Sequence, residues 1–170
     1  MYVEEKNIAD LDLVKVLLDS EMSAYEIESK TGITRAAISK YRNEKSNINN
    51  MPLGVAIKLT KISINRIDIL SAEILDKMKH SKPFEYVVVT DKKNNKALRD
   101  RETNNYASVY SYKEDGEGYY GVYSDIFGMS RKIDNRTNDD KEIKAALRKI
   151  LKLGVLVDRK EYLENSMNEK

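Results

Sequence analysis

Residues 23–46 have the sequence SAYEIESKTGITRAAISKYRNEKS, and this stretch decides the fold of the first half of the chain. Ser23, followed three residues later by Glu26, forms a capping box, which is a signal that starts a helix. Thr34 is a cap of the same kind for a second helix. Gly32 lies between the two, where the chain reverses and glycine adopts a backbone conformation that is costly for other residues. The stretch therefore predicts two short helices joined by a tight turn.

The second of these helices has the properties of a helix that reads DNA. Ile27 and Ile38 fill the angle between the two helices, which turns the opposite face of residues 34–43 outward. In a helix-turn-helix domain, such a face enters the major groove and meets the edges of the bases. We expect base contacts from Arg35, Ala36, Ser39, Lys40 and Asn43. We expect phosphate contacts from the polar groups around them, namely Ser23, Tyr25, Thr34, Arg42, Lys45 and Asn47.

Two points remain open at this stage. Glu28 stands four residues before Gly32, where the motif usually has a small residue, so the sequence does not settle the exact packing of the two helices. The alternative interpretation is a helical hairpin with a solvated basic face. The caps, the glycine, the inward isoleucines and the basic outer face all agree with the helix-turn-helix interpretation, and such agreement is harder to obtain by chance.

Apolar residues at helical spacing continue on both sides of this motif. Residues 11–18 form one such stripe, and Pro52 suits the first turn of a fourth helix that includes residues 53–60. Residues 65–78 predict a fifth helix, which either connects two domains or forms the seam of a dimer. The composition then changes near residues 80–83, and eight of the eleven tyrosines follow.

The second part of the chain alternates as strands do. Runs rich in Val and Tyr predict three strands, at residues 84–90, 106–112 and 119–123. A helix is predicted over residues 139–153, with Gly154 as its stop, followed by a tail that frays from Asn165. We therefore expect an α+β protein. Its N-terminal all-α helix-turn-helix domain spans residues 1–80, and a small α+β domain with an antiparallel sheet spans residues 81–170.

Tyrosines are frequent in the two later strands, and at least some of them must point away from the small core, because neighbouring residues of a strand alternate between its faces. Exposed tyrosine suits a binding interface, while cross-strand aromatic pairs that only stabilise the sheet are the alternative. The acidic hairpin between the strands, with Asp125 beside it, either imitates phosphates toward a nucleic-acid-binding protein or is a solvated turn. The candidate partner-binding residues are Tyr110, Tyr112, Glu114, Asp115, Glu117, Tyr119, Tyr120 and Tyr123.

Composition excludes most catalytic chemistry. The chain has no cysteine, and His80 is its only histidine, which excludes disulfides, thiolate nucleophiles and multi-histidine metal sites. We interpret His80 as a solvent-exposed linker residue. Asp139, Asp140 and Glu142 fall at the start of a predicted helix, where acidic residues favour the positive end of the helix dipole. We expect no catalytic site, no metal, no cofactor and no enzymatic activity.

Net charge is only +2 over 170 residues, so DNA binding has to come from a local basic cluster on a shaped surface. A single module of this kind binds weakly, and we therefore expect a homodimer on an inverted repeat of double-stranded DNA. The longest apolar runs are far short of the roughly 20 residues that cross a bilayer. We expect a cytoplasmic protein with no membrane partner.

The segment from Ser23 to Lys45 resembles the Cro/C1 repressor type of helix-turn-helix in phages of Gram-positive bacteria, over about residues 10–62. Its fusion to a Lys- and Tyr-rich α+β module is similar to the staphylococcal type II-A anti-CRISPR proteins with a fused repressor domain. The resemblance implies a bifunctional phage protein in the cytoplasm of the host bacterium. Its N-terminal part would bind an inverted repeat in its own promoter and repress transcription, with Arg35, Ser39 and Lys40 at the operator. Its C-terminal part would inhibit a CRISPR RNA-guided nuclease, bound with its guide RNA, by blocking target DNA binding. The tyrosine strands and the acidic hairpin would then face the nuclease.

The rival interpretation is a plain transcriptional repressor or antitoxin. Its C-terminal domain would only dimerise or sense a ligand. A nucleic-acid-processing enzyme is disfavoured, because the chain lacks the residues for catalysis.

Overall fold

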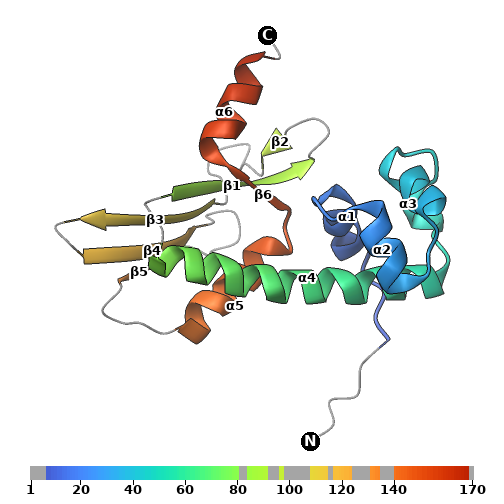
Figure 1. Ribbon diagram of the computed structural model, residues 1–170, viewed down its shortest axis with the longest axis horizontal. Helices are drawn as coiled ribbons and strands as arrows, with labels where there is room; N and C mark the ends of the chain where they lie inside the picture. Colours follow the sequence, from blue (N-terminus) through green and yellow to red (C-terminus); the bar gives the residue numbers. More distant parts are fainter. Residues whose placement is uncertain are drawn as a thin grey trace, which may run out of the picture. The chain divides into compact units, whose positions relative to one another are not determined.

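The computed structural model describes residues 7–80, 84–91, 96–97, 108–114, 117–123, 131–134 and 140–168. This part of the chain contains six α-helices and an antiparallel sheet of six strands, so the protein is of mixed α and β structure (Figure 1). The chain divides into two compact units, Met1–Arg66 and Ile67–Lys170. The division falls inside a long helix, whereas the boundary expected at residue 80 is where that helix ends.

Four helices build the N-terminal unit. They are α1 (Leu11–Asp19), α2 (Ala24–Thr31), α3 (Arg35–Arg42) and the first turns of α4 (Leu53–His80), which follows the short 3-10 helix η1 (Ile48–Asn50). The Ser23 hydroxyl accepts a hydrogen bond from the Glu26 N–H at 3.1 Å, and the Thr34 hydroxyl accepts one from the Ala37 N–H at 3.2 Å. Both caps stand where the sequence predicted them, because each satisfies an N–H group that the first turn of a helix leaves unpaired.

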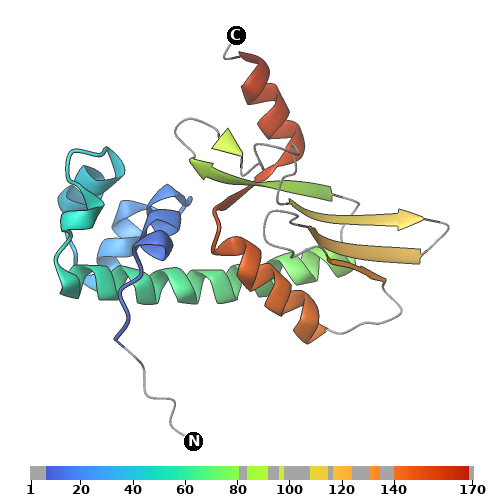
Figure 2. The same ribbon diagram turned by 180° about the vertical axis from the view of Figure 1, so that it is seen from behind.

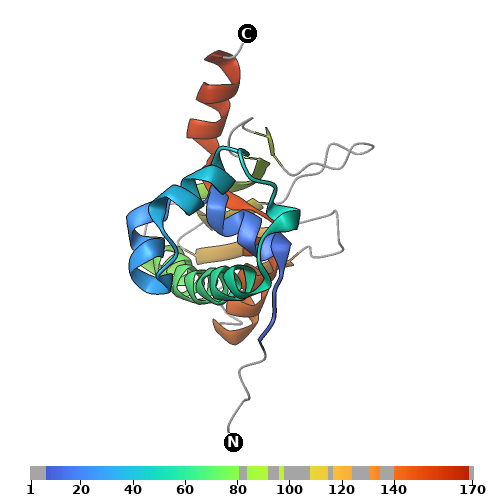
Figure 3. The ribbon, with the colours of Figure 1, turned by 90° about the vertical axis from the view of Figure 1, so that its right-hand side faces the viewer.

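The apolar core of this unit lies where the four helices meet (Figure 3). Each helix contributes a fully buried side chain: Leu17 from α1, Ile27 from α2, Ile38 from α3 and Leu59 from α4. Burying a side chain of this size contributes roughly 1.5–3 kcal/mol. The inward positions predicted for Ile27 and Ile38 are confirmed.

The long helix α4 runs for 28 residues without a break. The prediction of two helices here, at residues 53–60 and 65–78, was wrong. Ser63, between the two predicted helices, is buried, and its hydroxyl donates to the Leu13 carbonyl oxygen at 2.7 Å. A buried hydroxyl with such an acceptor is satisfied and does not interrupt the helix.

Most of the apolar side chains of the predicted dimer seam on this helix are buried within the single chain. Ile67, Ile74 and Met78 are all buried there, and only Leu70 of the expected stripe is partly exposed. This favours the alternative in which residues 65–78 form a connection, because a seam needs apolar side chains that are free to meet a partner.

The sheet of the C-terminal unit has the strand order β2-β1-β3-β4-β5, and β6 also pairs with β1. Its strands are β1 (Phe84–Asp91), β2 (Lys96–Ala97), β3 (Ser108–Glu114), β4 (Glu117–Tyr123), β5 (Arg131–Asp134) and β6 (Val155–Asp158). All pairs are antiparallel, as predicted, and the β3–β4 register sets Tyr112 opposite Tyr119. The three predicted strands correspond to β1, β3 and β4, while residues 106–107 lie outside the described part.

Two helices complete this unit, α5 (Asp140–Leu151) near β4 and α6 (Arg159–Asn168) near β1 and β6 (Figure 2). The sequence predicted the first and missed the second, because the tail was expected to fray from Asn165. The Asp158 carboxylate accepts hydrogen bonds from the N–H groups of Lys160 and Glu161 at 2.8 and 3.3 Å. Asp158 followed three residues later by Glu161 was therefore an overlooked signal for the start of a helix.

Gly154 has a different role from the one expected of it. The helix α5 ends at Leu151, and Gly154 lies buried next to the start of β6. A Cβ atom at this position would overlap the backbone of Val89 and the side chain of Val88 in β1. Glycine is needed here because two backbones approach closely.

We predict that Gly154→Ala lowers the free energy of unfolding by about 1–3 kcal/mol, because the added methyl group has no space beside β1. The same substitution at Gly54, where a Cβ meets nothing within 4 Å, is the control. Gly54 lies in the first turn of α4, so alanine there should be neutral or stabilise by up to about 1 kcal/mol. Urea denaturation of the two full-length variants, followed by circular dichroism, measures both. Equal changes at the two positions would contradict the close approach.

Candidate nucleic-acid interface

The turn between α2 and α3 holds the two helices in a defined arrangement. Gly32 has a φ of 74°, in the left-handed region, and its N–H donates to the Glu28 carbonyl oxygen at 2.8 Å. The Thr31 hydroxyl donates to the Ile27 carbonyl oxygen at 2.6 Å and accepts from the Ile33 N–H at 3.1 Å. The turn is therefore held by hydrogen bonds on both sides of the glycine, and α3 starts directly after it.

The outer face of α3 carries the side chains expected to contact bases. Arg35, Ala36, Lys40 and Asn43 are exposed, while Ser39 is only half-buried. The inner face carries Ile38, which is fully buried. The structure thus places four of the candidates on α3 and the fifth, Asn43, at its C-cap, and all but Ser39 are exposed to solvent.

Arg35, at the first position of α3, is held by its neighbours on α2. Its Nε lies 2.9 Å from Oε2 of Glu28, and its guanidinium carbon lies 5.9 Å from the centre of the Tyr25 ring. The other carboxylate oxygen of Glu28, Oε1, accepts a hydrogen bond from the Arg35 backbone N–H at 3.3 Å. The Arg35 side chain nevertheless stays 63% exposed. Glu28, which the sequence marked only as a departure from the motif, is thus a functional candidate that the sequence did not identify.

Most of the predicted phosphate contacts lie at the ends of these two helices. Ser23, Tyr25, Thr34, Lys45 and Asn47 are all exposed. Ser23 and Thr34 accept a hydrogen bond as caps but keep a hydroxyl proton to donate. All five therefore have solvent access at or near the ends of α2 and α3.

Arg42 differs from the other predicted phosphate contacts, because two of its nitrogens already have partners inside the unit. Its Nε donates to the Leu18 carbonyl oxygen at 2.9 Å, and one Nη donates to the carbonyl oxygen of Met22. Burial lowers the pKa of Arg42 below its usual value, and the nearby carboxylate of Asp19 raises it in part. This arginine ties the last turn of α3 to the carbonyl groups around the α1–α2 connection.

The backbone after α3 turns sharply. Glu44 has a φ of 58°, a left-handed conformation that is uncommon for residues other than glycine. The N–H of Lys45 donates to the Lys40 carbonyl oxygen, and the N–H of Glu44 donates to that of Tyr41. These two bonds form the Schellman arrangement that ends many helices, here with glutamate in place of the usual glycine.

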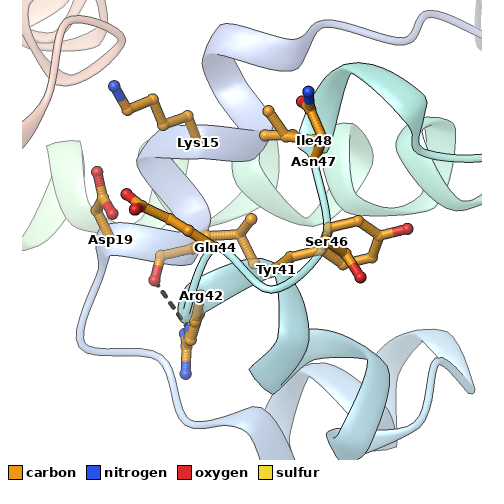
Figure 4. Close-up of a pocket in the computed structure, with 9 residues that line it drawn as sticks. Lys15, Asp19, Tyr41, Arg42, Glu44, Ser46, Asn47 and Ile48 are labelled. Carbon is orange, nitrogen blue, oxygen red and sulfur yellow. Dashed lines mark hydrogen bonds between the residues drawn. The ribbon is translucent and has the colours of Figure 1, made fainter.

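A hollow of about 320 Å³ lies beside this turn (Figure 4). Its walls come from α1, from the end of α3 and from the turn and η1 that follow, and the hydrogen bond from Arg42 to the Leu18 carbonyl oxygen is drawn as a dashed line. Two cationic side chains, Lys15 and Arg42, are matched by two acidic ones, Asp19 and Glu44. The lining therefore has no excess charge that would select an ionic ligand.

The chain matches no protein-family model, no curated protein and no solved structure. Within the described ranges, no group of three or more histidine, aspartate or glutamate side chains is placed to hold a metal ion. Across the same ranges, none of the helices combines the length and apolar character that a membrane span requires.

The other predicted residues of interest lie in the C-terminal unit. Tyr110, Tyr112 and Glu114 belong to β3, and Glu117, Tyr119, Tyr120 and Tyr123 belong to β4. Their side chains, and Asp115, Asp125 and Asp139 altogether, lie outside the part of the chain that the structure describes. His80 is the exposed last residue of α4, and Asp140 starts α5, where its carboxylate pairs with the ammonium group of Lys79 at 2.6 Å.

We predict that Arg42→Ala destabilises the fold by about 1–3 kcal/mol, because it leaves the carbonyl oxygens of Leu18 and Met22 without their charged donor. Lys40→Ala, an exposed position on the same helix, is the control and should change the free energy of unfolding by less than about 0.5 kcal/mol. Thermal and urea denaturation measure both variants. If Arg42→Ala unfolds like the wild-type chain and loses only affinity for DNA, Arg42 is a phosphate contact, as the sequence first suggested.

Proposed function

We propose that the N-terminal unit is a helix-turn-helix domain that binds double-stranded DNA, with α3 as its recognition helix. The observation that carries this proposal is the exposure of Arg35, Lys40 and the C-cap residue Asn43 on the outer side of α3, whose inner side is buried in the core. A helix that fits the major groove needs such a face, because base edges offer donors and acceptors that side chains at its first turns can reach.

The charges of the chain support a local rather than a general attraction to DNA. The net charge is +2, so the whole molecule does not attract the phosphate backbone strongly. The exposed basic residues of this surface, Arg35, Lys40 and Lys45, lie together on α3 and the turn that follows it. Affinity would then depend on this cluster and on a second copy that doubles the number of contacts.

We further propose that the DNA is an inverted repeat and that the chain binds it as a homodimer that represses transcription from its own promoter. The resemblance of residues 23–45 to phage repressors supports this biological role. Because most of the apolar stripe of residues 65–78 is buried within one chain, the interface between the two copies would use other surfaces.

We predict that Arg35→Ala weakens binding to the preferred duplex by about 1–3 kcal/mol and relaxes base preference, because a bidentate contact to guanine is lost. The full-length chain selects its preferred duplex from a randomised pool, and fluorescence anisotropy then gives its affinity for that duplex and for unrelated ones. Lys58→Ala removes one exposed positive charge from α4 instead, and should leave base preference unchanged. An equal loss on every duplex would make Arg35 a phosphate contact.

Inhibition of a CRISPR RNA-guided nuclease by the C-terminal unit is a proposal that the resemblance alone supports. The alternative is a repressor or antitoxin whose C-terminal unit only dimerises or senses a ligand. The two differ in what the protein does to target cleavage.

We predict that an excess of the full-length chain stops cleavage of target DNA by a type II nuclease loaded with its guide RNA. The Arg35→Ala variant should inhibit equally well, because its change lies on the operator-binding surface. A gel assay of target cleavage measures both. Complete cleavage at excess protein would eliminate inhibition of the nuclease tested and favour the alternative.

A further inference from the structure

The carboxylate of Glu28 makes two contacts with one residue, Arg35. Its Oε1 accepts the backbone N–H of Arg35, and its Oε2 pairs with Nε of the same residue at 2.9 Å. The first contact anchors the start of α3, where a negative charge also favours the positive end of the helix dipole. The second contact acts on the side chain, and so the same group that anchors the helix orients the guanidinium.

Tyr25 makes a third contact, with the same guanidinium. The exposed ring of Tyr25 lies under it, with 5.9 Å between the guanidinium carbon and the ring centre. This is within the range at which a cation is attracted to the face of an aromatic ring. Glu28 and Tyr25 are one turn apart on α2, so both restraints come from the same helix.

These restraints leave one edge of Arg35 available. Nε forms an ion pair with Glu28, and within the described part of the chain neither Nη has a hydrogen-bond partner. Guanine presents two acceptors in the major groove, O6 and N7, to which an arginine can donate two parallel hydrogen bonds. An arginine held by Nε offers its two Nη groups to that pair of acceptors. An arginine without this restraint can rotate toward a phosphate.

We propose that Glu28 is a positioning residue that determines specificity: it holds Arg35 in the orientation that reads guanine and keeps it from the phosphate backbone. The inference rests on the proposed DNA binding and adds a residue that does not itself touch a base. The Glu28 side chain is 32% exposed, so its charge also repels nearby phosphates within the Debye length of about 8–10 Å. Glu28 should therefore strengthen binding to the preferred duplex relative to all others.

Glu28→Gln tests this inference, because glutamine keeps an oxygen for the Arg35 backbone N–H but loses the charge that holds Nε. We expect the ratio of affinities for the preferred and an unrelated duplex to fall roughly fivefold or more, the lower end of the discrimination from one bidentate contact. Affinity for the unrelated duplex should stay equal or rise. Glu26→Gln is the matched control, since it removes the same charge from an exposed position of α2 and should leave the ratio unchanged.

The double variant Glu28→Gln with Arg35→Ala gives a second measurement, which distinguishes positioning of Arg35 from a merely structural role of Glu28. If Glu28 acts through Arg35, the glutamine change should not lower base preference further once Arg35 is gone, so the two effects will not add. The thermal unfolding midpoint of each variant shows whether the fold is intact.

Three outcomes would overturn the inference. Equal gains in affinity for all duplexes with Glu28→Gln would show that Glu28 only repels phosphate. Equal losses with a lower unfolding midpoint would show that it only anchors the helix. A wild-type chain with the same affinity for every duplex would overturn both the proposed function and this inference. A base preference that depends on Arg35 but not on Glu28 would overturn this inference alone.

Discussion

The left-handed turn at Gly32 is the constraint on which the rest of the N-terminal unit depends. A positive φ at this position reverses the chain within three residues and lets Ile27 and Ile38 meet in one core. Because that contact directs one side of α3 inward, the other side has to face solvent. The exposure of Arg35 and Lys40 is therefore a consequence of how two isoleucines pack.

Local signals in the sequence were enough to place most of the elements. The caps at Ser23 and Thr34 and the strands β1, β3 and β4 depend on neighbouring residues, and the sequence located them well. The burial of Ser63 within α4 depends instead on the Leu13 carbonyl oxygen, which accepts a hydrogen bond from its hydroxyl and lies 50 residues away in sequence. The need for glycine at position 154 similarly comes from the close approach of the β1 backbone. Periodicity along the chain carries no information about such distant partners.

In the candidate site, too, some features follow from neighbouring residues and others depend on residues that are distant in sequence. The outward positions on α3 follow from helical spacing, so four of the five expected base contacts are exposed. The roles of Glu28 and Arg42 depend on contacts across the turn and with the α1–α2 connection, which residue type alone does not specify. An arginine near the end of a recognition helix looks the same in sequence whether its donors face a phosphate or a carbonyl group. For both Glu28 and Arg42, the interacting partner is known only from the structure.

The bonds of Arg42 to the carbonyl groups of Leu18 and Met22 have a consequence for the cost of association. They join the last turn of α3 to the segment that precedes α2, so both ends of α3 are held within the unit before any ligand binds. A ligand then has little conformational entropy to remove from the main chain, since most of that cost has already been met during folding. The conformational entropy still to be lost on binding is then mainly that of exposed, long side chains such as Lys40 and Lys45.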